Sequence, residues 1–108
     1  MTLNAAIRRA IKEVKHMDPA TLSESDRHLH RGLHSMISGL RIHKPHNCQT
    51  HIESRADYVT NAIDSLGDLW DQTESDRLCW SYRVFDRVAS VWQRKAIEES
   101  AWLDSFDA

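Results

Sequence analysis

Three histidines and a cysteine gather near the middle of the chain: His43, His46, Cys48 and His51. Imidazole and thiolate are the ligands that zinc prefers, and four such donors can complete a tetrahedral site. The spacing H-x2-H-x-C-x2-H matches no structural zinc pattern, however, and a loop this short strains a four-ligand geometry. We therefore expect no bound cofactor, and zinc held by these four residues is the alternative.

Two further histidines, His30 and His34, stand four positions apart on the segment before this loop. Residues at this spacing lie on one face of a helix. Because histidine changes its charge near neutral pH, a metal- or pH-responsive protein is the second interpretation of the chain.

The remaining patterns do not indicate catalysis. Glu13-Val-Lys-His16 is the only Glu-x-x-His motif, whereas a carboxylate-bridged di-iron bundle needs two such motifs and two further glutamates. Neither a nucleophile elbow nor a glycine-rich loop supports acyl or phosphoryl transfer. Cys48 has histidine neighbours in the sequence, but that proximity is poor evidence for a thiol nucleophile. The sequence therefore predicts that the protein is not an enzyme.

The aromatic residues indicate binding to another protein. The chain has four tryptophans, and tryptophan is enriched at the energetic centres of protein interfaces. On a helical wheel, Trp70 and Trp92 fall on predicted core stripes, whereas Trp80 and Trp102 fall on a second face of the last helix. The candidate protein-binding residues are Trp80, Val84, Val88, Val91, Trp102 and Phe106.

Small residues follow one line of an earlier predicted helix, at Gly32, Ser35 and Gly39. Glycine inside a helix costs about 1 kcal/mol relative to alanine, so another helix is expected to approach closely there. Close packing within one chain and a contact with a second subunit both explain the line. We take close packing inside the bundle as the first interpretation and keep the line as a candidate dimer contact.

Four helices must position these residues. Apolar residues recur every three or four positions over Leu3–His16, and Asp18-Pro19 ends this first helix. The second begins after Ser23, which caps it, and reaches about Ile42. The third is predicted to open at Thr50 and to run as one heptad seam through Trp70; the fourth, capped by Thr73, runs on past Leu103.

The fourth helix has apolar side chains on two faces. A surface helix buries one stripe of about 100°, and roughly twice that arc is apolar here, with Arg83 and Arg87 among the polar remainder. The helix therefore runs through the middle of the molecule, or another chain covers its second face. At 1.5 Å per residue it would be about 45 Å long, so its end should project from a small globule or the helix should bend.

Composition and charge limit the remaining classes. The 108 residues predict one domain over residues 1–108, with a real core. No window approaches the roughly 18 apolar residues of a membrane span. The first helix is too charged for a signal peptide. Two cysteines suit a reducing compartment, so we expect a cytoplasmic protein.

The charge is split along the chain: residues 1–55 carry an excess of Lys and Arg, and residues 56–108 carry an excess of Asp and Glu. A basic face on the first helix includes Arg8, Arg9, Lys12 and Lys15. The sequence pI of about 6.4 argues against nucleic-acid binding, since strong phosphate binders usually lie well above 9.

These observations predict an all-α small helical bundle, formed by a short N-terminal helix and three long ones. We expect a non-enzymatic regulator, an inhibitor, anti-activator or adaptor, that acts sterically on a transcription factor or another regulatory complex. A homodimer through the last helix is also expected, because a projecting apolar end needs a cover.

Overall fold

The computed structural model describes the backbone of residues 1–42 and 49–107 and the side chains of residues 1–40 and 55–98. Its elements are α1 (Leu3–His16), the 3-10 turn η1 (Pro19–Thr21), α2 (Glu24–Ile42), α3 (Gln49–Ser65), α4 (Gly67–Gln72) and α5 (Asp76–Asp107). The described residues contain no strand, which confirms the predicted all-α class. None of the helices described is both long enough and apolar enough to cross a membrane.

Short polar side chains begin three of the helices. The Thr2 hydroxyl accepts a hydrogen bond from the backbone N–H of Ala5, at 3.2 Å, and so caps α1. The Ser23 hydroxyl caps α2 in the same way, at 3.2 Å from the N–H of Asp26, as the sequence predicts. At α5 the prediction is wrong by two residues, because Ser75 rather than Thr73 accepts from the N–H of Leu78, at 3.3 Å.

The predicted third helix is divided in the structure. Its heptad seam was expected to continue to Trp70, but α3 ends at Ser65 and α4 begins at Gly67. At the junction the N–H of Leu66 bonds to the carbonyl of Ile63, three residues back, at 3.1 Å. This tighter turn interrupts the α-helical hydrogen-bond ladder. It places the Trp70 ring in a stack with Tyr82 of α5, with centroids 4.8 Å apart.

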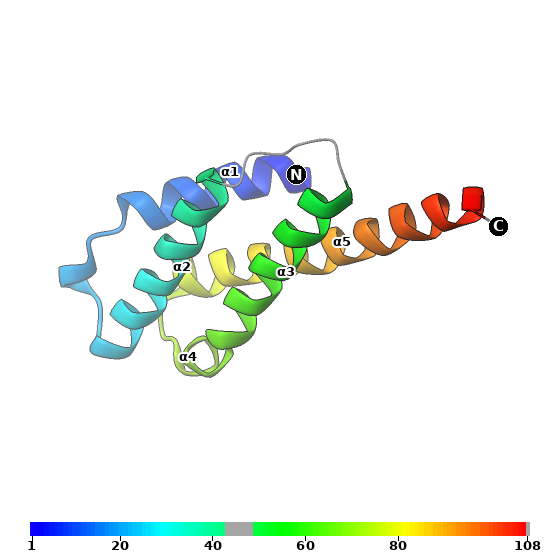
Figure 1. Ribbon diagram of the computed structural model, residues 1–108. Coiled ribbons are helices and arrows are strands. Elements are labelled where there is room, and N and C mark those ends of the chain that lie inside the picture. The colour runs from blue at the N-terminus through cyan, green and yellow to red at the C-terminus, as the bar shows by residue number, and fades with distance from the viewer. Residues whose placement is uncertain (43–48, 108) are drawn as a thin grey trace.

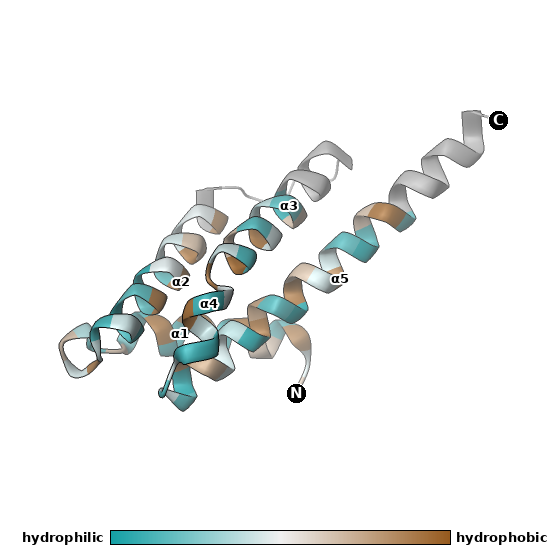
Figure 2. Ribbon diagram, turned by 90° about the horizontal axis from the view of Figure 1, so that it is seen from below, coloured by the Kyte–Doolittle hydropathy of each residue, from teal (hydrophilic) through white to brown (hydrophobic). Residues whose placement is uncertain are grey.

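The two apolar faces of α5 are explained by two neighbouring helices. α5 packs against α3 on one side and α1 on another, and α2 closes the bundle through contacts with α1, α3 and α4 (Figure 1). Apolar residues line the faces where the helices meet (Figure 2). The largest fully buried side chains include Phe85, Leu29, Leu33, Met36, Ile63, Leu78 and Val88. For this part of its length, α5 is internal, which is the first of the two predicted arrangements.

The far end of α5 extends away from the other helices (Figure 1). The molecule is accordingly elongated, with principal extents of 56 × 25 × 23 Å. This agrees with the expectation that a helix of such length projects from a small bundle.

Candidate protein-binding surface

The predicted binding residues of α5 differ in how much of each side chain is exposed to solvent. Val88 is fully buried and Val84 is 8% exposed, and both belong to the hydrophobic core of the single chain. Trp80 and Val91 are half-buried. The side chains of Trp102 and Phe106 lie outside the described residues. Of the predicted set, Trp80 therefore offers the largest described side chain with exposed area.

Trp80 lies in an open groove between the start of α1 and the first turns of α5. The groove has a volume of about 520 Å³. Leu3, Ala6 and Val84 contribute apolar surface to its lining, and Arg83 and Arg87 contribute positive charge. Both arginine side chains are exposed. The groove thus combines an apolar floor with a cationic rim.

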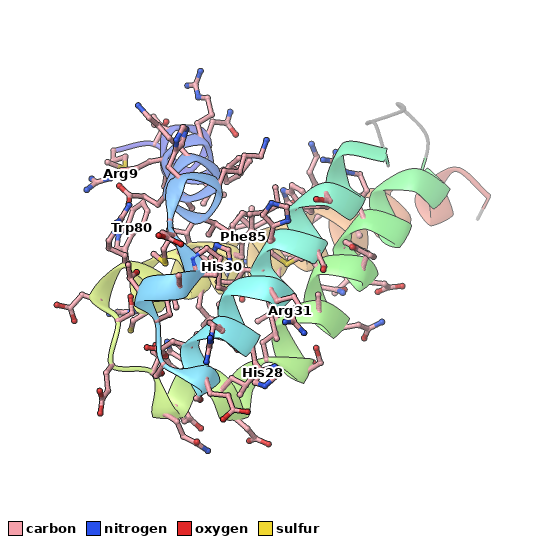
Figure 3. The ribbon with its side chains drawn as sticks, turned by 90° about the vertical axis from the view of Figure 1, so that its left-hand side faces the viewer. Arg9, His28, His30, Arg31, Trp80 and Phe85 are labelled. Atoms are coloured by element: carbon pink, nitrogen blue, oxygen red, sulfur yellow. The ribbon has the colours of Figure 1, made fainter. Side chains whose placement is uncertain are left out.

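A third arginine, on α1, contacts the Trp80 ring of α5. The guanidinium carbon of Arg9, on α1, lies 4.9 Å from the centroid of the Trp80 ring, and Figure 3 shows the two side chains side by side. A cation at this distance over an indole face is attracted by the ring quadrupole, by about 0.5–1 kcal/mol at an exposed site. The contact orients Trp80 and keeps the Arg9 charge beside the groove.

The arginines of the groove have no carboxylate partner within the part of the chain that the structure describes. There, the one ion pair joins Arg77 of α5 to Glu13 of α1, with Nε 2.6 Å from the carboxylate oxygen. Arg9, Arg83 and Arg87 therefore place three positive charges in or beside the groove that form no ion pair with the described residues. In the sequence these arginines fall on polar faces expected to be solvated, so the cluster was not predicted. The spacing of Trp80, Arg83 and Arg87 by three and four residues was the available signal.

The line of small residues on α2, at Gly32, Ser35 and Gly39, packs against other residues of the same chain. A methyl group at Gly39 would overlap the hydroxyl of Tyr58 on α3, and one at Gly32 would overlap the side chain of Leu66. Tyr58 also donates a hydrogen bond to the carbonyl of Ser35, at 3.4 Å. These contacts account for the close approach that the glycines allow. A subunit contact along the same line stays a prediction.

His30 and His34 of α2 have described side chains, and their rings lie close together. His30 is buried between α1 and α2, where its Nε2 hydrogen-bonds the carbonyl of Val14 at 2.8 Å (Figure 3). The exposed His34 lies beside it, with ring centroids 6.1 Å apart. Among the residues with described side chains, no group of three or more His, Cys, Asp or Glu could hold a metal ion.

The predicted zinc ligands are not among those residues. His43, His46 and Cys48, together with the side chain of His51, lie outside the described part of the structure. Zinc binding by these four residues stays a prediction.

Comparison with protein-family models, with curated proteins and with solved structures finds no match for this chain.

Proposed function

We propose that this protein is a non-enzymatic regulator that binds another protein through the groove between α1 and α5. The observation that carries the proposal is the position of Trp80, half-buried in the groove and held under Arg9 at 4.9 Å. Tryptophan and arginine are the residues most enriched at the energetic centres of interfaces, and here they lie in contact.

The surroundings of Trp80 favour a protein partner over a small ligand. The groove is open and spans two helices, and its rim carries Arg83 and Arg87. An apolar floor surrounded by charge is the usual anatomy of a protein interface. Since both walls are helices packed on the core, little conformational entropy is lost when a partner docks. We expect the partner to present an apolar side chain flanked by acidic residues.

The proposed mechanism is steric. A partner seated in the groove cannot use the same surface for its own assembly, so this chain would act as an inhibitor, anti-activator or adaptor. The arginine rim would speed association and set the orientation of the complex. We further propose a cytoplasmic location and a transcription factor or other regulatory complex as the class of partner.

The test is retention of partner proteins on immobilised protein, compared across three variants. Trp80→Ala removes the anchor, and Arg83→Glu reverses one charge of the rim. Arg94→Glu is the matched control, because Arg94 is also exposed on α5 but does not line the groove. We expect a partner that the wild type and Arg94→Glu retain and that both groove variants lose.

Circular dichroism must show the same helicity for all four proteins. A partner that binds the groove variants as tightly as the wild type would refute the proposed surface. Loss of helicity in Trp80→Ala would show that this tryptophan is mainly structural, and Arg83→Glu would then decide.

A further inference from the structure

A second cavity lies between α1, α2, α3 and α5, and none of its described lining residues lines the groove. Its volume is about 380 Å³, within the 300–1,000 Å³ range typical of small-molecule sites. The walls are mainly apolar and include Ile7, Ile11, Ile37, Leu40 and Phe85. Such a lining favours a ligand with an apolar body.

Among the residues with described side chains, one charged residue lines this apolar cavity. Arg55 of α3 extends over Trp92 of α5, with its guanidinium carbon 4.5 Å from the ring centroid. Its Nε is buried and has no hydrogen-bond partner among those residues. Within the described part of the chain, no carboxylate forms an ion pair with it. Burial lowers the pKa of Arg55 from its ordinary value, because desolvation disfavours the charged form.

A buried polar group without a partner is costly, and a charged one more so. The stacking on Trp92 offsets part of this cost but leaves the Nε donor of Arg55 without an acceptor among the described residues. An anion beside Arg55 would supply that acceptor. Of the common anions, a carboxylate matches the planar, two-donor edge of a guanidinium in a bidentate contact.

We propose that this cavity binds a small monocarboxylate with an apolar body, whose carboxylate pairs with Arg55 and whose body lies against Ile7, Ile11 and Leu40, the half-buried apolar residues of the wall. The apolar wall and the Arg55 charge, which has no ion-pair partner among the described residues, argue against two simpler ligands, a neutral apolar molecule and a small inorganic anion. A neutral apolar molecule would leave Arg55 without an acceptor, and a small inorganic anion would leave the apolar surface unfilled. This inference does not depend on the proposed protein-binding function.

The test is calorimetric titration of the full chain with sodium decanoate and, separately, with decan-1-ol, which has the same chain without the charge. We expect decanoate to bind with one-to-one stoichiometry and at least tenfold more tightly than decan-1-ol. Arg55→Gln keeps a side chain of similar length and removes the charge, so it should weaken decanoate binding at least tenfold and leave decan-1-ol binding unchanged.

Two further variants distinguish the effect of the Arg55 charge on binding from the effect of the free volume of the cavity. Arg94→Gln removes an exposed arginine that does not line the cavity, and we expect wild-type binding of both ligands. Ile7→Trp enlarges a half-buried wall residue, and it should weaken both ligands alike.

Several results would overturn the proposal: no decanoate binding to the wild type, equal affinity for decanoate and decan-1-ol, or unchanged decanoate affinity in Arg55→Gln. If Arg55→Gln does not fold, the comparison of the two ligands on the wild type decides by itself.

Discussion

Thr73 donates a hydrogen bond to the carboxylate of Asp26 at 2.6 Å, across 47 positions of sequence. Asp26 is only 5% exposed, and its backbone N–H donates a hydrogen bond to the capping hydroxyl of Ser23. The Thr73 hydroxyl also accepts from the N–H of Ser75, at 3.3 Å. One threonine thus joins the start of α2 to the segment that begins α5.

Loss of this bond should destabilise the fold. Thr73→Val keeps the shape of the side chain but leaves the Asp26 carboxylate without its donor, so we expect the free energy of unfolding to fall by about 1–3 kcal/mol. Urea unfolding followed by circular dichroism measures the change. Asp68→Asn, an exposed carboxylate on α4, is the control and should change it by less than about 0.5 kcal/mol. A double mutant with Asp26→Ala whose effects simply add would show that the pair contributes nothing.

Alkaline pH should weaken the fold through Tyr82. This buried phenol donates to the carbonyl of Ile63 at 2.9 Å. Burial raises its pKa above the ordinary value of 10.0, and the nearby charges of Asp86, Asp64 and Asp71 raise it further. The unfolded chain therefore loses this proton at a lower pH than the folded one. Above about pH 10 the unfolded state binds fewer protons, so the free energy of unfolding falls as pH rises.

The measurement is urea unfolding at a series of pH values from about 8 to 11. Tyr82→Phe removes the titrating group and should flatten the decline above pH 10, although the variant starts from a lower stability because it lacks the hydrogen bond. The two proteins should differ by a constant amount below about pH 9, where the phenol is protonated in both states. An equally steep decline in Tyr82→Phe would assign the effect to other groups.

The close approach of α2 to α3 at Gly39 should not tolerate a side chain. Gly39→Ala would force the Tyr58 hydroxyl to move, and we expect a loss of about 1–3 kcal/mol from overpacking, partly offset by the better helix propensity of alanine. Thermal or urea unfolding reports the loss. Tyr58→Phe in the same chain removes the obstructing oxygen and should restore part of the stability. If Gly39→Ala changes the molecular mass in solution but not the free energy of unfolding, the line of Gly32, Ser35 and Gly39 is a subunit contact instead.

The oligomeric state tests the proposed homodimer and the zinc alternative together. We expect light scattering on a size-exclusion column to give the mass of two chains, unchanged by EDTA. A monomer would contradict the homodimer. A mass or shape that changes with EDTA would favour a metal site at His43, His46, Cys48 and His51, since removal of a structural metal disrupts the fold it supports.

The helical class and most helix positions follow from local sequence signals alone. The residues of α1 repeat their apolar positions with the helical period, and the start of α2 follows from the Ser23 cap; both signals are local, so they are readable without tertiary contacts. The excess apolar arc of α5 also predicted a helix with two covered faces, which α1 and α3 cover near Phe85.

The contacts between residues distant in sequence depend on how the helices pack and could not be predicted from local patterns. The break at Leu66 accompanies the packing of Trp70 on Tyr82, a contact that a regular heptad pattern does not predict. Arg9 and Trp80 are 71 positions apart, and Arg55 and Trp92 are 37 apart, yet each pair is in contact. Helical periodicity says which residues share a face but not which faces pack together. Both proposed sites lie between faces that only the folded bundle brings into contact.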